Sequence, residues 1–260
     1  MIKIVPWLNG SGNITLTYSG QGDGPILIES DPNNLAVARS QALHVNAGNL
    51  TVEFTVNQQA GAGPQPTDYV DLNLPSGLLW AKGNISKDEL GHYYIANPED
   101  SGCYFSWGNI DGHNEGDSYS FDVSSYNNSP GRALSDNIAI NDAQHDAAFA
   151  IFGSPWHLPS TDDLQELFDN TDKEWTKINN RNGWKFMKKT DHNVFILIPA
   201  VGNMAGTSIN YMDVRVYCWT SSYESSNYAY AMRGISGEII YNTQHRRYGF
   251  QIRPVRSPLI

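Results

Sequence analysis

Short segments of alternating hydrophobic and polar residues dominate the first 57 positions of the chain. A period of two is typical of half-buried β-strands, and turn-forming pairs such as Asn9-Gly10 separate the segments. The pattern predicts a small β-sandwich over residues 1–57, with strands at 2–5, 14–18, 25–30 and 50–56. Residues 58–67 are rich in Gly, Pro and Gln and are predicted to link this block to a second domain, residues 68–260.

Two segments of the second domain have the spacing of amphipathic helices. The first is predicted to begin after the N-cap Asn141 and to end at Gly153. The second is predicted from Ser160, with Asp163 as a capping-box acid, to about Asn170. The residues predicted to face inward are Ala143, Ala147, Ala148, Ile151 and Phe152 in the first helix and Leu164, Leu167 and Phe168 in the second.

After Trp175 the pattern returns to strands. A strand, a turn and a second strand are also expected near Tyr69. Two helices followed by many strands predict an α+β domain with a segregated sheet. The later strand segments read KFMKK, NVFILIPAVG, VYCWTSS, YAYAMRG, GEIIYN and YGFQIRPV.

The window 207–249 differs in composition from the rest of the chain. It holds seven of the fourteen tyrosines and no lysine, and it is crowded with Ser, Asn, Gly and Arg. Tyr gives a large amphipathic contact at low rotamer cost, while Ser, Gly and Asn give adaptable hydrogen bonding. The composition therefore predicts a recognition surface rather than a catalytic pocket.

Individual residues admit a structural and a functional interpretation. Four tryptophans within strand-like blocks are predicted to belong to the core: Trp80, Trp107, Trp156 and Trp219. Tyr211, Tyr223 and Tyr228 lie in Asn/Ser-rich loops and are candidates for exposure. The pair Arg246-Arg247 is interpreted either as a clamp for an acidic ligand or, in preference, as a solvated strand edge.

The net charge of −10 argues against a nucleic-acid partner, because binding phosphates needs a basic face. No run approaches the ~20 apolar residues of a membrane span, so no membrane insertion is predicted. The first residues lack the apolar region of a secretory signal. Six of the seventeen basic residues lie beyond Ala200, and all six are arginines. The C-terminal face is therefore expected to be less acidic than the remainder.

Several blocks of the second domain recur in the order of a known family. They are YVDLNLPSGLLWAKGN, YYIAN, YFSWGN, GSPWHLPSTDDLQEL, NGWKF, VFILIPAVGN, YCWTSS, AYAM and YGFQIRPV. Over residues 67–256 the chain resembles the Fibrobacter succinogenes major paralogous domain family. That resemblance implies a C-type-lectin-like fold related to formylglycine-generating enzymes. The first block, through VEFTVNQQ, resembles the small Ig-like modules, including the BACON type, of Bacteroidetes proteins.

Some C-type-lectin-like proteins are variable proteins of diversity-generating retroelements, in which adenines near the 3′ end of the gene are rewritten. Substituting adenines in AAC or AAT codons cannot give Met, Trp, Glu, Gln or Lys. The resemblance therefore implies an invariant scaffold at Met212, Trp219, Glu224, Met232, Glu238 and Gln244. The implied ligand-binding residues are Ser208, Asn210, Tyr211, Asp213, Arg215, Tyr217, Tyr223, Ser225, Asn227, Tyr228, Tyr241, Asn242, His245 and Arg247.

An enzymatic function is not predicted. The resemblance would require a pair of C-terminal cysteines for copper, but the two cysteines are Cys103 and Cys218, which are better interpreted as buried thiols than as a disulfide. The His-x-x-x-His-x-Glu spacing of the related iron-dependent synthases is absent, as is a Gly-x-Ser-x-Gly nucleophile elbow. No catalytic residue and no cofactor is predicted.

Residues 110–122 nearly copy a calcium-binding loop. The ligand positions of an EF-hand loop would fall on Asp111, His113, Glu115 and Asp122, with Gly116 at the turn. His is a poor ligand for a hard cation, and Asp at the last position is too short for the usual bidentate Glu. A solvated surface loop is the favoured interpretation.

These observations predict a protein that recognises a protein or glycan on a cell surface. The leading hypothesis is a retroelement-diversified receptor-binding protein of a phage or a gut Bacteroidetes bacterium, located on the virion or the bacterial surface. A bacterial adhesin or surface lectin of fixed specificity is the alternative. An oxidase of the formylglycine-generating type is the third and least favoured hypothesis.

Overall fold

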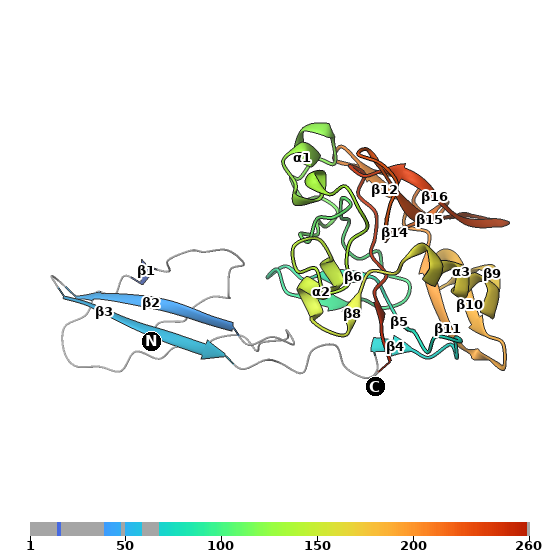
Figure 1. The fold of residues 1–260 in the computed structure, drawn as a ribbon, viewed down its shortest axis with the longest axis horizontal. Coiled ribbons are helices and arrows are strands. Elements are labelled where there is room, and N and C mark those ends of the chain that lie inside the picture. Colours follow the sequence, from blue (N-terminus) through green and yellow to red (C-terminus); the bar gives the residue numbers. More distant parts are fainter. Residues whose placement is uncertain (1–14, 17–38, 48–49, 59–67, 259–260) are drawn as a thin grey trace. The chain divides into compact units, whose positions relative to one another are not determined.

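The computed structural model describes residues 15–16, 39–47, 50–58 and 68–258 of the chain. The chain divides into two compact units, Met1–Gly63 and Pro64–Ile260 (Figure 1). Each unit is described by itself below.

The described residues of the first unit form a three-stranded sheet. β2 (Arg39–Ala47) and β3 (Leu50–Gln58) pair antiparallel along their whole length, and β1 (Thr15–Leu16) pairs parallel with β2. The strand predicted at 50–56 is confirmed as β3, and β2 was not predicted. Of the strand predicted at 14–18, residues 15–16 form β1 and the others lie outside the described residues. The predicted strands at 2–5 and 25–30 and residues 59–67 of the predicted linker lie outside the described residues. The described part of the first unit is too small to test the predicted sandwich.

In the second unit, short strands bring the start and the end of the unit together. A four-stranded sheet has the order β4-β5-β17-β8, so the last strand lies between two early ones. Its members are β4 (Tyr69–Val70), β5 (Leu79–Ala81), β8 (Trp156–His157) and β17 (Val255–Arg256). Two hairpins accompany it: β6 (Ile85–Lys87) with β7 (Tyr93–Ile95), and β12 (Asn203–Ala205) with β13 (Ser208–Asn210).

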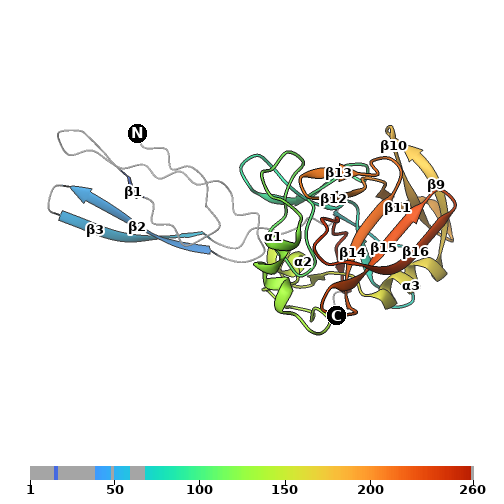
Figure 2. The same ribbon diagram turned by 90° about the horizontal axis from the view of Figure 1, so that it is seen from above.

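Two longer antiparallel meanders supply most of the strand content (Figure 2). The first consists of β9 (Thr171–Ile178), β10 (Arg181–Lys188) and β11 (Asp191–Pro199). The second consists of β14 (Val216–Tyr223), β15 (Tyr228–Ile235) and β16 (Glu238–His245), with β15 in the middle.

The helices are short. They are α1 (Val123–Asn127), the 3₁₀ turn η2 (Pro130–Ala133), α2 (Ala147–Phe152) and α3 (Thr161–Asn170). α3 confirms the second predicted helix, including the capping box between Ser160 and Asp163 and the burial of Leu164 and Leu167. α2 begins later than predicted because Asp146, rather than Asn141, caps it through Phe149 N. Asn141 has φ +69° and Ala143 is exposed.

The predicted α+β class is wrong, because the protein is all-β. Strands make up 41% of the structure and helices 13%, with three α-helices among the described residues. The prediction gave the first helix five extra residues and omitted β9, which is polar along much of its length. The four tryptophans predicted to belong to the core are buried, which confirms that part of the analysis.

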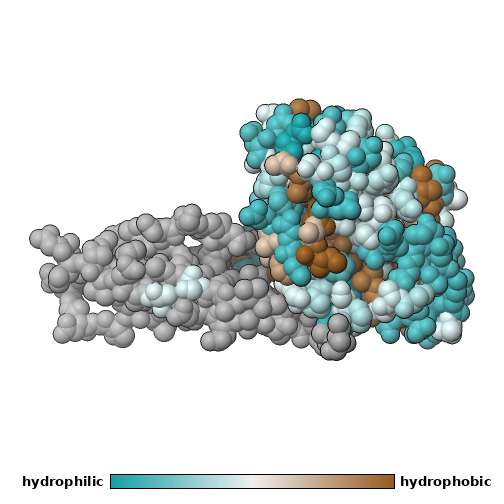
Figure 3. Space-filling view, in the orientation of Figure 1, coloured by the Kyte–Doolittle hydropathy of each residue, from teal (hydrophilic) through white to brown (hydrophobic). Residues whose placement is uncertain are grey.

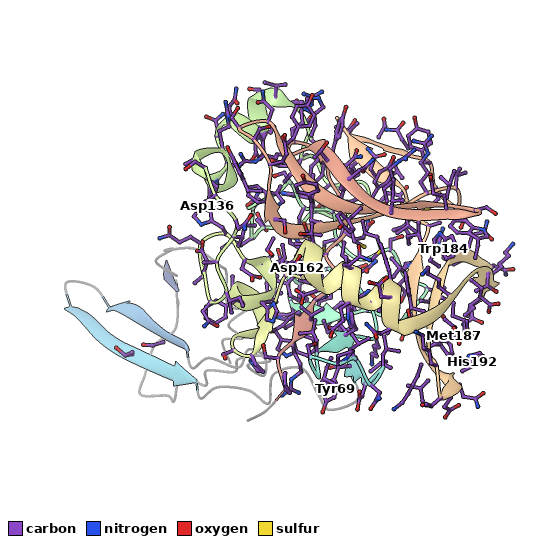
Figure 4. The ribbon with its side chains drawn as sticks, turned by 45° about the vertical axis from the view of Figure 1, so that its right-hand side comes forward. Tyr69, Asp136, Asp162, Trp184, Met187 and His192 are labelled. Carbon is purple, nitrogen blue, oxygen red and sulfur yellow. The ribbon has the colours of Figure 1, made fainter. Side chains whose placement is uncertain are left out.

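The β14–β16 sheet separates two hydrophobic cores. One core contains Trp107, Trp156, Trp219 and Phe250 together with α2, and the other contains Trp80, Trp184, Phe186 and Met232 together with α3. Figure 4 shows Trp184 beneath the β15–β16 hairpin, with Met187 and His192 farther along β10 and β11. Because both faces of the sheet are packed over part of their area, its strands and connecting loops are held in fixed positions.

Candidate recognition surface

The direction of each side chain on the β14–β16 sheet follows from the strand register. Residues directly opposite one another share a face, and neighbours along a strand point to opposite faces. We call one side the Tyr217 face. It carries Tyr217, Trp219, Ala229, Ala231, Arg233, Ile240, Asn242 and Gln244. We call the other side the α3 face. It carries Val216, Cys218, Tyr228, Tyr230, Met232, Ile239, Tyr241, Thr243 and His245.

β13 and the loop that joins it to β14 display the first candidate residues. Ser208 and Asn210 are exposed, and Tyr211 is 48% exposed. Tyr211 and Asp213 both have left-handed backbone angles, φ +63° and +58°, which non-glycine residues adopt at a cost of about 1–2 kcal/mol. The surrounding contacts hold this conformation.

Arg215 and Arg181 supply those contacts. The guanidinium of Arg215 lies 3.9 Å from the centre of the Tyr211 ring and donates to the Tyr217 hydroxyl at 3.2 Å. Arg181 pairs with the Asp213 carboxylate at 3.0 Å. The Tyr217 hydroxyl raises the pKa of Arg215, which remains a cation. The loop is therefore a fixed platform for Tyr211 and Arg215.

Tyr217 itself belongs to the core. It is 5% exposed and its ring lies 4.6 Å from the ring of Phe250 in a stacked arrangement. Tyr217 affects the surface only through its hydroxyl, which accepts the hydrogen bond that orients Arg215.

The opposite end of the sheet carries the second group of candidates. Ser225, Asn227 and Tyr228 lie in the β14–β15 connection or at its end, and Tyr228 is 37% exposed. The Tyr228 hydroxyl and His245 Nε2 are 3.0 Å apart, with their rings 4.3 Å apart. Burial, and then the charge of Arg247, lower the pKa of His245, so the neutral imidazole accepts the Tyr228 hydrogen bond at neutral pH.

Tyr223 and Arg247 complete this group, and both are half-buried. The Tyr223 ring packs 6.1 Å from that of Trp107, so Tyr223 is partly scaffold. The Arg247 guanidinium lies 5.0 Å from the ring of Tyr248.

Two adjacent candidates on β16 point in opposite directions. Tyr241 is on the α3 face, 6.4 Å from the ring of Phe168, and its hydroxyl is 3.4 Å from the Gln165 amide oxygen. Asn242 is on the Tyr217 face, where its oxygen accepts from Gln244 at 2.8 Å. The candidate residues therefore form two surfaces rather than one, which the composition of the window did not reveal.

The burial of Arg246 contradicts both interpretations that the sequence offered for this residue. It is fully buried, so it is neither a solvated strand edge nor a clamp for a ligand. It donates to the carbonyls of Gly131, Leu134, Ser225 and Ser226, and its guanidinium lies 4.3 Å from the centre of the Trp107 ring. Burial lowers its pKa from the usual value. Arg246 thus ties η2 and the residue that follows it to the loop between β14 and β15.

The implied scaffold positions differ in burial. Trp219 and Met232 are in the cores, Met212 and Gln244 are half-buried, and the two glutamates, Glu224 and Glu238, are exposed. The sequence analysis omitted Arg233, whose place on the Tyr217 face follows from its register opposite Tyr217 and Ile240. The alternation of YAYAMRG places Arg233 on the side of Ala229 and Ala231, and this signal was available in the sequence.

Three of the four proposed ligand side chains in the calcium-like loop make contacts within the protein, and the fourth, Glu115, is exposed. Asp111 accepts from the Tyr93 hydroxyl, and Asp122 caps α1 through Ser125 N. His113 stacks on Tyr119 with ring centres 3.8 Å apart. Within the described ranges, no group of three or more His, Cys, Asp or Glu side chains is placed to hold a metal ion.

Both cysteines are free and buried, as predicted. Burial raises the pKa of each thiol to about 12, so neither is a thiolate at neutral pH.

Comparisons with family models, curated proteins and solved structures find no match to this chain. No helix in the part of the chain that the structure describes is long and apolar enough to cross a membrane.

Proposed function

We propose that the protein recognises a molecule on a cell surface through the C-terminal part of its second unit. The observation that carries the proposal is that solvent-accessible side chains in this region are held in place by a layer of buried side chains. Tyr211, Tyr228 and Asn242 reach solvent, while Trp219, Arg246 and Phe250 are buried directly beneath or between the segments that carry them. A surface fixed in this way accepts changes of side chain without loss of the fold.

Retroelement diversification of this surface is part of the same proposal. Its support is the position of the implied variable residues, since Ser208, Asn210, Tyr211, Asn227 and Tyr228 are all exposed. DNA downstream of the gene should then contain an imperfect repeat of the codons for residues 207–250 that differs chiefly at adenines, followed by a reverse-transcriptase gene. Without such a repeat, an adhesin or lectin of fixed specificity is the better proposal.

Catalysis is not proposed. Copper-dependent oxidation would need thiolate ligands. Burial raises the pKa of the Cys218 thiol, which lies on the α3 face of β14, and Cys103 lies in the other core. The polar residues of the display surface are instead arranged as contacts, with Arg215 stacked on Tyr211 and Gln244 bonded to Asn242.

Binding to intact cells tests the proposal. The full chain, labelled at a lysine outside residues 207–249, is incubated with a panel of gut bacteria and read by flow cytometry. Saturable binding to a subset of strains is expected. Absence of saturable binding to every strain, with the chain shown to be folded, contradicts a cell-surface receptor among that panel and removes the main support for recognition.

A further inference from the structure

The Tyr217 face presents two guanidinium groups although the protein as a whole is acidic. Arg233 lies on this face, and Arg215 reaches it through the Tyr217 hydroxyl. The net charge of the whole chain is −10, so the two arginines on this face are opposite in sign to the chain as a whole.

Within the described residues, the nearby acidic groups form no ion pair with Arg215 or Arg233. Asp213 is already paired with Arg181 at 3.0 Å. Glu238 is on the same face as Arg233, opposite Ile235 and one row away, and within the described residues it forms no ion pair with Arg233. No ion pair or hydrogen bond of the Arg233 side chain occurs within the described parts of the chain, and Arg233 is half-buried. Its guanidinium therefore has hydrogen-bond donors available for a bound group.

Planar polar and aromatic side chains adjoin these arginines. Asn242 and Gln244 lie one and two rows beyond Arg233 on the same face, and the bond between their amides fixes both orientations. The donors of the Asn242 amide and the oxygen of the Gln244 amide remain for a ligand. At the other end, the Tyr211 ring is covered by Arg215 on one side and is 48% exposed overall.

We infer that the Tyr217 face binds an acidic carbohydrate, a sugar polymer that carries carboxylate or sulfate groups. Guanidinium groups bind such oxyanions in a bidentate manner, the amides match pairs of sugar hydroxyls, and the Tyr211 ring supplies an apolar surface for a pyranose ring. The inference rests on the proposed recognition function and specifies the chemistry of its ligand. The half-buried setting of the arginines strengthens their hydrogen bonds relative to fully exposed groups.

Binding of the full chain to four polymers tests the inference. The polymers are polygalacturonate, which carries carboxylates, heparin, which carries sulfates, neutral dextran, and poly-L-glutamate as an acidic peptide. Affinity for polygalacturonate or heparin, with none for dextran, is expected to fall as salt rises. The stronger of the two acidic sugars identifies which anion the face prefers.

Variants locate the binding. Arg215→Gln with Arg233→Gln should weaken binding by at least about tenfold, because two charge-assisted hydrogen bonds are lost. The matched control, Lys177→Gln with Lys188→Gln, removes the same charge from the β9–β10 hairpin and should bind as the original chain does. Arg215→Lys with Arg233→Lys keeps the charge but loses the planar fork, so it should also bind more weakly. Thermal unfolding of each variant confirms that it is folded.

Several outcomes overturn the inference. They are equal binding to poly-L-glutamate and acidic sugars, equal losses in the Gln variant and its control, undiminished binding by the Lys variant, or no binding to any acidic sugar. Each is distinguishable from failure of the proposed function. A chain that binds cells saturably but ignores acidic sugars retains its recognition function with a different ligand.

Discussion

Replacing Arg246 by alanine should destabilise the second unit more than a change at the surface of the same turn, which follows β16. Arg246 is fully buried and donates to four carbonyls, two in or directly after η2 and two in the loop between β14 and β15. Three of these carbonyls keep another donor: Gly131 O accepts from Leu134 N, Ser225 O from Tyr228 N, and Ser226 O from Arg132. Leu134 O keeps none within the described residues.

The expected loss follows from these contacts. An unsatisfied buried carbonyl costs about 1–3 kcal/mol. Loss of the stacking on Trp107, at 4.3 Å, adds up to about 2 kcal/mol. Together with the space left by the side chain, these terms predict a destabilisation of about 3–5 kcal/mol. For a unit of this size each kcal/mol lowers Tm by about 2–4 °C, so the expected shift is on the order of 10 °C.

Thermal and urea unfolding of the full chain, followed by tryptophan fluorescence, measure this change. Arg247→Ala is the matched control, because Arg247 is the next residue, carries the same charge and is half-buried. It should cost less than about 1 kcal/mol. The argument is refuted if the two variants unfold within experimental error of each other, or if Arg246→Ala unfolds with the original chain.

Three further predictions concern the same unit. Gly202→Ala should destabilise the unit by at least about 1–3 kcal/mol and displace the Tyr211 loop, because Gly202 has φ +65° and a Cβ would lie 1.9 Å from Asn210 O. The control Gly237→Ala, at φ +92° with open space around it, should cost only the strain of the backbone angle. Equal losses of stability in urea unfolding would contradict this prediction. Tyr241→Ala should lower the free energy of unfolding by about 1–3 kcal/mol, because Tyr241 packs against the second core. The neighbouring change Asn242→Ala should cost less than about 0.5 kcal/mol, because Asn242 is on the other face. Calorimetry showing the reverse order would mean that the face assignment is wrong. Burial raises the pKa of Asp146 to about 6, above its unfolded value of 3.8. Its contribution to stability is therefore full below about pH 4, and about 3 kcal/mol is lost as the pH rises through 6. Asp146→Asn should flatten the pH dependence of stability in urea between pH 4 and 7, and an unchanged slope would count against a raised pKa.

Sequence patterns predicted the elements that depend on local signals. The capping box at Ser160 and the aliphatic spacing of Leu164 and Leu167 are properties of adjacent residues, and α3 matches them. The start of α2 was missed because Asn141 and Asp146 are both good caps, and the choice depends on Asp146 Oδ2 also accepting from Leu158 N, a contact across the fold.

The site was harder to predict for a similar reason. Composition identified a Tyr- and Asn-rich window, yet which residues share a face depends on strand register. Arg246 shows the limit most clearly, because nothing local distinguishes it from Arg247, and its burial follows from loops more than a hundred residues earlier in the chain.

One comparison tests the recognition surface most directly. A chain carrying Tyr211→Ser, Asn242→Ser and Gln244→Ser is compared in cell binding with a chain carrying Glu174→Ser, Lys177→Ser and His192→Ser on the β9–β11 sheet. The first should lose at least about tenfold in affinity for the cells that the original chain binds while its Tm falls by no more than about 4 °C. The second should bind as before. Unchanged binding by the first chain, or equal losses in both, would contradict the assignment of the Tyr217 face and its adjoining loop as the recognition surface.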